Sequence, residues 1–107
     1  MKLVIQASGV MPYEPYGFTN CVRFKDVLYL SGISAMDLQG QVIGDDIETQ
    51  TVHTYQNIER VLWAGAGYVA TRKNIMTRHT YTSATIGISA LMVPGLLLEV
   101  QCTAAAP

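Results

Sequence analysis

The stretch GDDIETQTVHTYQNIERVLWAGAG, residues 44–67, has the pattern of one amphipathic helix with a recognisable beginning and end. Asp45 is a good N-cap residue, and Glu48 three residues later can complete a capping box. Gly65 and Gly67 provide the left-handed residue at which helices commonly end. The residues of one face recur at helical spacing: Ile47, Thr51, Tyr55, Ile58, Val61 and Leu62. A helix with a single apolar face needs a sheet to pack on.

Short strands are expected before this helix. Residues 2–6 are expected to form the first strand, and residues 19–34 a β-hairpin. Lys25 and Asp26 separate two runs of strand-forming residues, which indicates a two-residue turn. Because neither residue is glycine, the turn is strained or slightly longer than this. Residues 36–43 form a smaller loop or hairpin that leads into the helix.

Three more strands are expected after the helix, in residues 75–82, 84–91 and 96–103. The last of them alternates, so that one set of side chains faces the helix: Leu96, Leu98, Val100 and Cys102. The tail, residues 104–107, is expected to fray. The order β-β-β-α-β-β-β predicts a single α+β domain over residues 1–107, with the helix packed on one face of the sheet.

Glu99 does not fit its surroundings, because it lies in an otherwise apolar strand on the face turned away from the helix. A carboxylate there is costly unless it is solvated, paired or used in chemistry. One interpretation is a solvated face, or an ion pair with Arg78 on a neighbouring strand. The other is a functional carboxylate with raised proton affinity, which activates water or moves a proton.

The composition indicates assembly. Half of the 107 residues are hydrophobic and 14% are charged, against about 25% in an average globular protein. We therefore expect a face buried against copies of the chain, in an obligate homo-oligomer. The net charge of −1 and the lack of a basic cluster argue against nucleic acid as a partner. Cys21 and Cys102 are expected to be reduced thiols of a cytoplasmic protein, and no signal peptide or membrane span is expected.

The two histidines have ordinary explanations. His53 lies on the polar flank of the expected helix, which favours a solvated surface role, and His79 beside Arg78 favours a structural role in a strand. The sequence contains no Ser-His-Asp or Cys-His constellation, no phosphate-binding loop, no dinucleotide fingerprint and no metal-ligand spacing. We expect neither a metal nor a cofactor.

Three groups of residues, in this order along the chain, resemble the Rid (YjgF/YER057c/UK114) family. They are Ser31-Gly32 after a hydrophobic strand, then Gly44, Gln50, Thr51, Asn57 and Ile58 around the helix, and finally Pro94 through Glu99. The resemblance covers the chain from about Phe18 onward. It implies a chorismate-mutase-like α+β fold with a mixed sheet, a homotrimer, and ligand sites in clefts between subunits. It also implies hydrolysis of reactive imines and enamines, such as 2-aminoacrylate, to ketoacids and ammonia.

Several site residues follow from the resemblance. Glu99 falls on the glutamate that positions the attacking water, and Ser31 with Gly32 falls on the strand element that contributes hydroxyl and backbone contacts to substrate. Thr85 falls where a backbone N–H meets substrate.

The chain also departs from the family pattern. Phe18 takes the place of the pocket tyrosine, so that hydroxyl is expected to be lost. Ser83 takes the place of the arginine that binds the substrate carboxylate, and a hydroxyl cannot replace a bidentate guanidinium. Arg78 or Arg72 could substitute only with suitable geometry. The second helix of the family is expected to be missing, because the strands on either side of Ser83 abut directly.

The leading hypothesis is a Rid-like enzyme that acts on a small imine, enamine or related metabolite in a cleft between subunits. The reaction would be hydrolytic deamination or a proton transfer, on a substrate without an α-carboxylate or by altered chemistry. The alternative is a catalytically inactive ligand-binding or interaction module that keeps the Rid-type oligomer. The missing arginine and helix favour the alternative, and the retained Glu99 opposes it.

Overall fold

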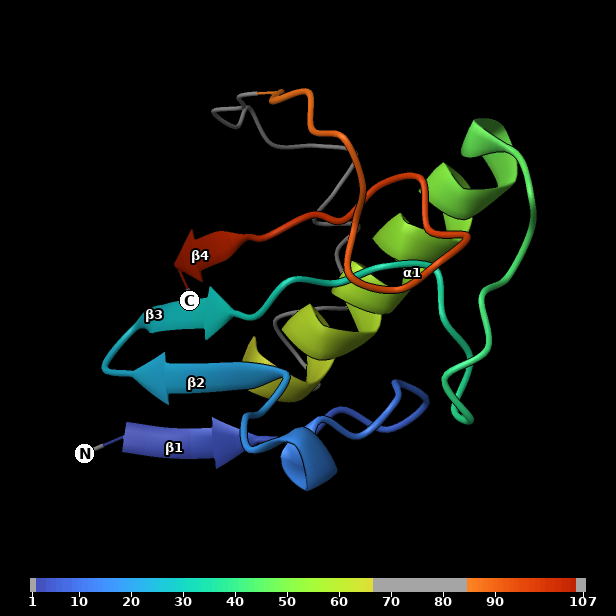
Figure 1. Cartoon of the computed structure of the whole chain (residues 1–107). Helices are drawn as coiled ribbons and strands as arrows, with labels where there is room; N and C mark the ends of the chain where they lie inside the picture. Colours follow the sequence, from blue (N-terminus) through green and yellow to red (C-terminus); the bar gives the residue numbers. More distant parts are fainter. Residues whose placement is uncertain (1, 67–84, 106–107) are drawn as a thin grey trace.

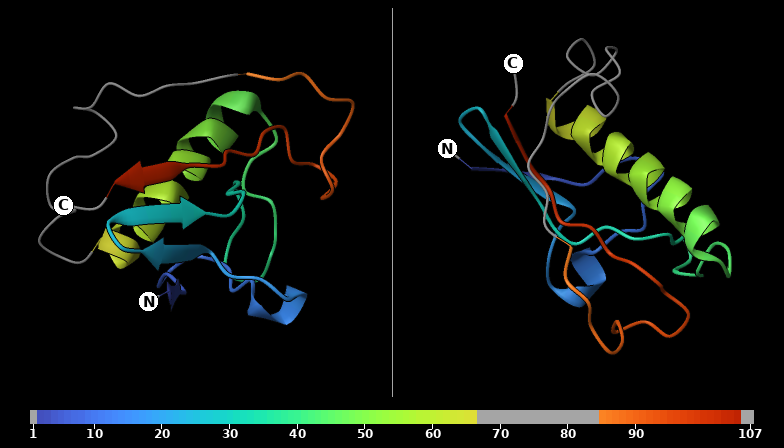
Figure 2. Two further views of the ribbon diagram at one scale, coloured as in Figure 1. Left: turned by 90° about the vertical axis from the view of Figure 1, so that its left-hand side faces the viewer. Right: turned by 90° about the horizontal axis from the view of Figure 1, so that it is seen from above.

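The described part of the chain contains a four-stranded antiparallel sheet and one long helix (Figure 1). A computed structural model describes residues 2–66 and 85–105. In chain order the elements are β1 (Lys2–Ile5), the 3-10 turn η1 (Glu14–Tyr16), β2 (Cys21–Phe24), β3 (Val27–Leu30), α1 (Ile47–Ala66) and β4 (Thr103–Ala105). The strands lie in the order β1-β2-β3-β4, and α1 crosses one face of the sheet (Figure 2). The expected α+β arrangement with one main helix is confirmed.

The β2–β3 hairpin forms as the sequence predicts. Phe24 pairs with Val27, so the turn has two residues. Lys25 takes φ 54° there, a left-handed conformation that is unusual for a residue other than glycine. The strain expected from a turn without glycine is therefore located at Lys25.

The helix begins one residue later than the sequence indicates. The Asp46 carboxylate, not that of Asp45, accepts a hydrogen bond from the Thr49 N–H at 3.2 Å, and the Asp46 carbonyl accepts one from Gln50 N at 3.1 Å. Bonds from the Thr49 hydroxyl and backbone hold the pKa of Asp46 below its usual range. Asp46 is therefore the N-cap, and the assignment to Asp45 was wrong.

The buried face of α1 differs from the predicted one, because it includes polar residues of the helix. Ile47, expected on the apolar face, is 51% exposed, whereas Gln50, Thr54 and Asn57 are buried. The Gln50 amide bonds the carbonyls of Gly44 and Gly95 and the N–H of Leu97, and the rest of the face packs on the sheet. The core combines helix and sheet residues: Ile58, Val61, Leu62, Cys21, Leu28, Leu30 and Ile33.

Gly65 serves packing rather than helix termination. It lies within α1, and a Cβ built on it would meet the Leu28 side chain at 3.0 Å. The glycine thus lets the last turn of α1 approach β3 closely, and the prediction that it ends the helix was wrong. The companion prediction for Gly67 lies outside the described residues.

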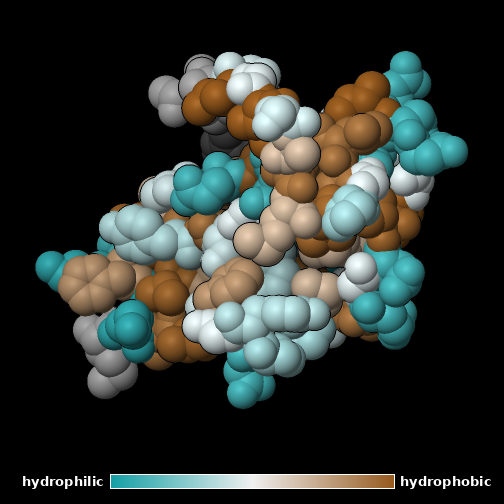
Figure 3. Space-filling view, viewed as in Figure 1, coloured by the Kyte–Doolittle hydropathy of each residue, from teal (hydrophilic) through white to brown (hydrophobic). Residues whose placement is uncertain are grey.

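The chain after the helix differs most from expectation. Residues 85–91 form no strand, and Ile86 and Ile88 are 80% and 61% exposed on this segment, at the top of Figure 3. The alternating pattern predicted a strand here, but no described strand pairs with this segment. The strand predicted in residues 75–82 and the missing second helix both concern residues outside the described part.

The final strand starts later and continues further than predicted. Gln50 holds the Leu97 N–H against the start of the helix, so the segment joins the sheet only from Val100. Ala105 pairs with Val27, which overturns the expectation of fraying for Ala104 and Ala105. The predicted alternation is confirmed, since Leu97 and Glu99 are exposed and their neighbours are less so. Across residues 2–66 and 85–105, no helix combines the length and hydropathy needed to cross a membrane.

Candidate functional site

A β-bulge at Ser31 and Gly32 is the foundation of the site. Leu30 N donates to Cys102 O at 3.0 Å, and Ile33 exchanges two 2.8 Å hydrogen bonds with Val100. The chain advances three residues from Leu30 to Ile33 but only two from Cys102 back to Val100. One residue of the first strand is therefore extra and unpaired, which defines a bulge. The bulge lets both Leu30 and Ile33 point into the core and frees the Gly32 backbone from the ladder.

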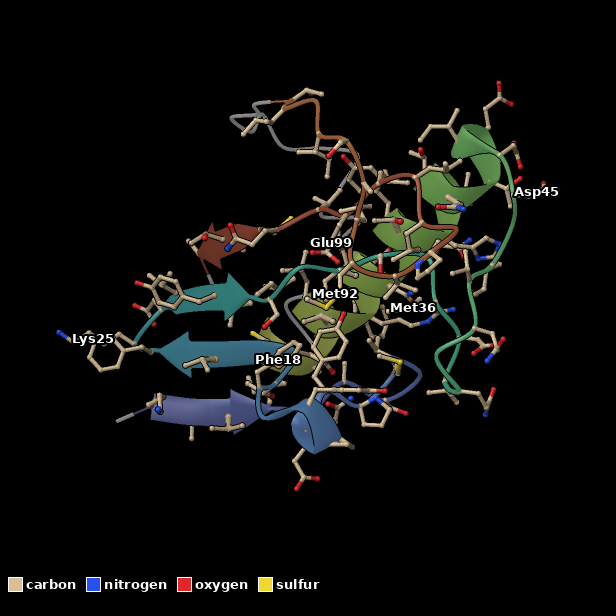
Figure 4. All side chains as sticks on the ribbon, viewed as in Figure 1. Phe18, Lys25, Met36, Asp45, Met92 and Glu99 are labelled. Atoms are coloured by element: carbon tan, nitrogen blue, oxygen red, sulfur yellow. The ribbon has the colours of Figure 1, made fainter. Side chains whose placement is uncertain are left out.

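The Glu99 side chain lies directly over Gly32. A Cβ built on Gly32 would overlap the carboxylate, with Glu99 Cδ only 2.7 Å away. No residue with a side chain could stand at position 32 without displacing that carboxylate. Figure 4 shows Glu99 on the segment that leads into β4, at the other end of the sheet from Lys25. Glu99 itself is exposed.

Tyr13 approaches the same glycine with its hydroxyl. The Tyr13 hydroxyl donates a 2.8 Å hydrogen bond to the Gly32 carbonyl, which the bulge leaves outside the ladder. The Tyr13 ring is 5% exposed and lies 4.8 Å, centroid to centroid, from the ring of Phe18. Burial, and then the charge of Glu99, raise the pKa of Tyr13 to about 12. The phenol therefore keeps its proton at neutral pH.

The loop that carries Tyr13 is held by a buried amide. Asn20 accepts a bond from Ala7 N at 3.0 Å and donates one to Met11 O at 3.2 Å. Gly17 closes η1 with φ 91°, a conformation that favours glycine, and Phe18 follows it toward β2 (Figure 4). Tyr13 and Phe18 are thereby presented on one side of the bulge.

The Ser31 hydroxyl is engaged within the chain. It donates to the Thr19 carbonyl at 2.6 Å, while Ser31 N donates to Asn20 O at 2.9 Å. On the other side of the bulge, the Gln101 amide donates to Leu30 O at 3.1 Å. Ser31 therefore ties the bulge to the loop before β2, and its hydroxyl oxygen keeps lone pairs for a further donor.

Together these groups form an exposed carboxylate beside backbone amides, a neutral phenol and a half-exposed aromatic ring. Such a carboxylate can accept a proton from water and return it to a nearby basic atom. Within the described part of the chain, no three His, Cys, Asp or Glu side chains gather as the ligands of a metal would.

Comparison with known proteins finds a partial sequence match and a shared fold. No family model matches the sequence. A RutC family protein of Saccharolobus solfataricus is 35% identical over 69 residues, which are 64% of this chain and 52% of that protein. The chain thus spans about half the length of this curated relative.

Solved structures share the fold over the whole chain. Yeast Mmf1 superposes with a TM-score of 0.83 at 11% identity, covering 100% of both chains. YyfA of Yersinia pestis, described as a conserved Rid family protein, gives 0.75 at 23% identity over 99% of this chain and 100% of that one. Identities this low show the fold, and the RutC match adds the sequence relationship. The chain resembles the Rid family in its fold and, over 69 residues, in its sequence.

The structure brings only some of the Rid site residues together. Ser31, Gly32 and Glu99 meet at the bulge, and Phe18 joins them through the ring of Tyr13. Thr85 is exposed on a separate segment, and no hydrogen bond links it to this group within the described residues. Ser83, Arg78, Arg72 and His79 lie outside the described residues, whereas His53 is partly buried on α1.

Tyr13 is the residue that reasoning from the sequence missed. Its segment carries two prolines and two glycines and no helix or strand pattern, and the Rid resemblance pointed instead to Phe18 five residues later. The loss of the pocket tyrosine hydroxyl at position 18 stays a prediction, and Tyr13 brings a different hydroxyl to the Gly32 carbonyl. The pairing of two prolines with tyrosines was the available signal for an ordered turn.

Proposed function

We propose that this Rid-like protein is an enzyme that hydrolyses a small imine or enamine, or moves a proton on a related metabolite, with Glu99 as the acid–base group. The observation that carries the proposal is the position of the Glu99 carboxylate over Gly32, whose carbonyl accepts a hydrogen bond from the protonated Tyr13. The free thiols of Cys21 and Cys102 agree with action in the cytoplasm.

The chemistry needs one group that both accepts and returns a proton. Glu99 takes a proton from water as the water oxygen attacks the imine carbon, and the electron pair of the C=N bond moves to nitrogen. The same carboxyl group returns that proton to the nitrogen, which gives a carbinolamine. Glu99 then takes the proton of the new hydroxyl and passes it to the amine, so that the C=O bond forms as the C–N bond breaks and ammonia leaves. An enamine first gains a proton at carbon, which Glu99 can also supply.

The substrate class is inferred from position 83, where the Rid pattern has an arginine and this chain has a serine. With serine at position 83, the chain has no guanidinium where the Rid pattern places the carboxylate clamp. We propose a substrate without an α-carboxylate, or one whose carboxylate is bound by Arg78 or Arg72. Assays should therefore include uncharged imines as well as imines derived from amino acids.

We propose that the working form is a homo-oligomer, most simply a trimer, with the site in a cleft between subunits. The sheet face opposite α1 supports this, because its side chains are apolar and exposed within the described chain: Val4, Phe24 and Tyr29 are 67%, 44% and 49% exposed. Glu99 is exposed in the single chain, so a neighbouring subunit has room to complete the site.

The test measures ammonia release from imines generated in situ, with and without the protein. Glu99→Gln keeps the shape and removes proton transfer, so we expect the catalysed rate to fall to the uncatalysed rate. Glu59→Gln on α1 is the matched control and should leave the rate unchanged. If the wild type binds a ligand without accelerating any of these reactions, the chain is a binding module that kept the Rid oligomer.

A further inference from the structure

The Tyr13 hydroxyl donates to a carbonyl, that of Gly32, which the strand ladder leaves unpaired. The bulge leaves the half-buried Gly32 carbonyl outside the ladder, and a carbonyl shielded from water without a donor is costly. The Tyr13 hydroxyl donates to it at 2.8 Å. The ring of Tyr13 packs on Phe18 with its plane tilted by 45°, a contact that phenylalanine would preserve. The hydroxyl group therefore has a role separate from that of the ring.

The Glu99 carboxylate lies against the same glycine, on the side where a Cβ would stand. The carboxylate lies so close to Gly32 that even a Cβ would overlap it. The next residues along the two strands, Ile33 and Val100, fix each other through two 2.8 Å hydrogen bonds. A rotation of the Gly32 peptide would therefore move the surface on which Glu99 rests, while the backbone of Glu99 stayed in place.

Tyr13 and Glu99 also interact electrostatically, since the charge of Glu99 opposes ionisation of the phenol. A phenol that stays protonated remains a donor through the whole neutral pH range. The phenol is thus available as a donor to the Gly32 carbonyl under working conditions, as a positioning interaction requires.

We propose that Tyr13 is a positioning residue for Glu99: its hydroxyl fixes the Gly32 carbonyl, and the fixed glycine peptide sets the place of the Glu99 carboxylate. The role of Glu99 in this inference rests on the proposed function. The geometric link from Tyr13 through Gly32 to Glu99 does not depend on which reaction the protein catalyses.

The kinetic test removes only the hydroxyl. Tyr13→Phe should lower kcat by about ten- to a hundredfold, as misplacement of a reacting group by about 1 Å does, with KM changed by less than about threefold. Tyr16→Phe, an exposed tyrosine on the same loop, is the matched control and should match the wild type. In a Glu99→Asp background, where a carboxylate remains but is already displaced by one methylene, Tyr13→Phe should cause a much smaller loss than in the wild type, because the two residues act as one unit.

Two kinetic results would overturn the inference. One is a kcat unchanged by Tyr13→Phe. The other is an equal fold-loss caused by Tyr13→Phe in the wild-type and Glu99→Asp backgrounds, which would indicate a purely structural role.

A spectroscopic experiment tests whether Tyr13 positions Glu99 even if no reaction is found. In protein labelled with ¹³C, the carbonyl signal of Gly32 and the carboxyl signal of Glu99 should both shift in Tyr13→Phe, and neither should shift in Tyr16→Phe. A wild type that releases no ammonia above the uncatalysed rate removes the proposed function but leaves this arm intact. A Glu99 carboxyl signal that stays in place while the Gly32 signal moves would overturn the inference itself.

Discussion

Gly32 is the point at which the sheet, the loop of Tyr13 and the side chain of Glu99 meet. Its importance comes from the absent side chain rather than from an unusual backbone, because its φ does not lie in the left-handed region. The atoms that a methyl group would meet belong to the end of the flexible Glu99 side chain. A substitution there moves the carboxylate and leaves the backbone in place.

Gly32→Ala is therefore expected to separate activity from stability. The free energy of unfolding should change by less than about 1 kcal/mol, while the rate of the Glu99-dependent reaction falls by about tenfold or more. Gly87→Ala, at an exposed glycine with open space around it, is the control. Urea denaturation with parallel rate measurements checks the prediction, and a fully active Gly32→Ala would show that Glu99 does not need its present position.

The raised pKa of Tyr13 has a consequence for stability at high pH. A tyrosine ionises near pH 10 in the unfolded chain but at about 12 in the folded protein. The folded state then binds more protons between these values. The stabilisation that Tyr13 contributes is therefore fully present below about pH 10, and this contribution is lost as the pH rises towards 12.

Tyr13→Phe should remove this contribution. The midpoint of urea unfolding should fall less steeply between about pH 10 and 12 in Tyr13→Phe than in the wild type, whereas Tyr16→Phe should follow the wild-type slope. Equal slopes for all three proteins would contradict the assignment of the raised pKa to Tyr13.

At the scale of elements, α1 is held by amide side chains as much as by apolar packing. Gln50 joins the carbonyls of Gly44 and Gly95 to the N–H of Leu97, and Asn57 donates to the carbonyls of Ser34 and Met36. These bonds fasten the helix to the loops that precede and follow it. They also draw residues 95–97 away from the sheet, which shortens the last strand.

Gln50→Leu should be costly for that reason. The leucine removes three part-buried hydrogen bonds, to the carbonyls of Gly44 and Gly95 and the N–H of Leu97, which corresponds to about 2–4 kcal/mol of unfolding free energy. Gln56→Leu, at an exposed position of the same helix, should change it by less than about 0.5 kcal/mol. Urea denaturation of the two variants makes the comparison, and similar costs would show that burial of Gln50 matters less than its hydrogen bonds suggest.

The elements predicted from the sequence are those with a local pattern. Helical periodicity located α1, and two strand-forming runs around Lys25 and Asp26 located the hairpin with its correct turn. The rotation of the helix toward Gln50 and Asn57 could not be predicted, because hydrophobic periodicity gives no weight to amides that bond distant loops.

The site was only partly predictable for a related reason. The resemblance to the Rid family brought Glu99, Ser31 and Gly32 forward as a group. The bulge that joins them depends on strand register, which no local pattern reveals. Tyr13 reaches the site through the loop that Asn20 holds in place, and long-range contacts of this kind leave no periodic signal.

At the scale of the whole molecule, the sheet has two unlike faces. Cys21, Leu28 and Leu30 face α1 and are buried. On the opposite face, Val22 pairs with Val4 and with Tyr29, which forms an apolar row across three strands. In the described chain this row is exposed at Val4 and Tyr29. A homo-oligomer that buries the row would explain the low charged fraction of the sequence, 14%.

Tyr29→Lys tests this assembly directly. An unpaired charge placed in a buried interface costs about 3 kcal/mol or more, which corresponds to about a hundredfold weaker association. Sedimentation equilibrium over a dilution series should show an oligomer for the wild type and a shift toward monomer for Tyr29→Lys. Tyr16→Lys adds the same charge at an exposed position off the sheet and should assemble like the wild type. Since the proposed site lies between subunits, Tyr29→Lys should lose activity in parallel with dissociation. A folded wild-type monomer at micromolar concentration, or a dissociated Tyr29→Lys that keeps full activity, would contradict the shared site.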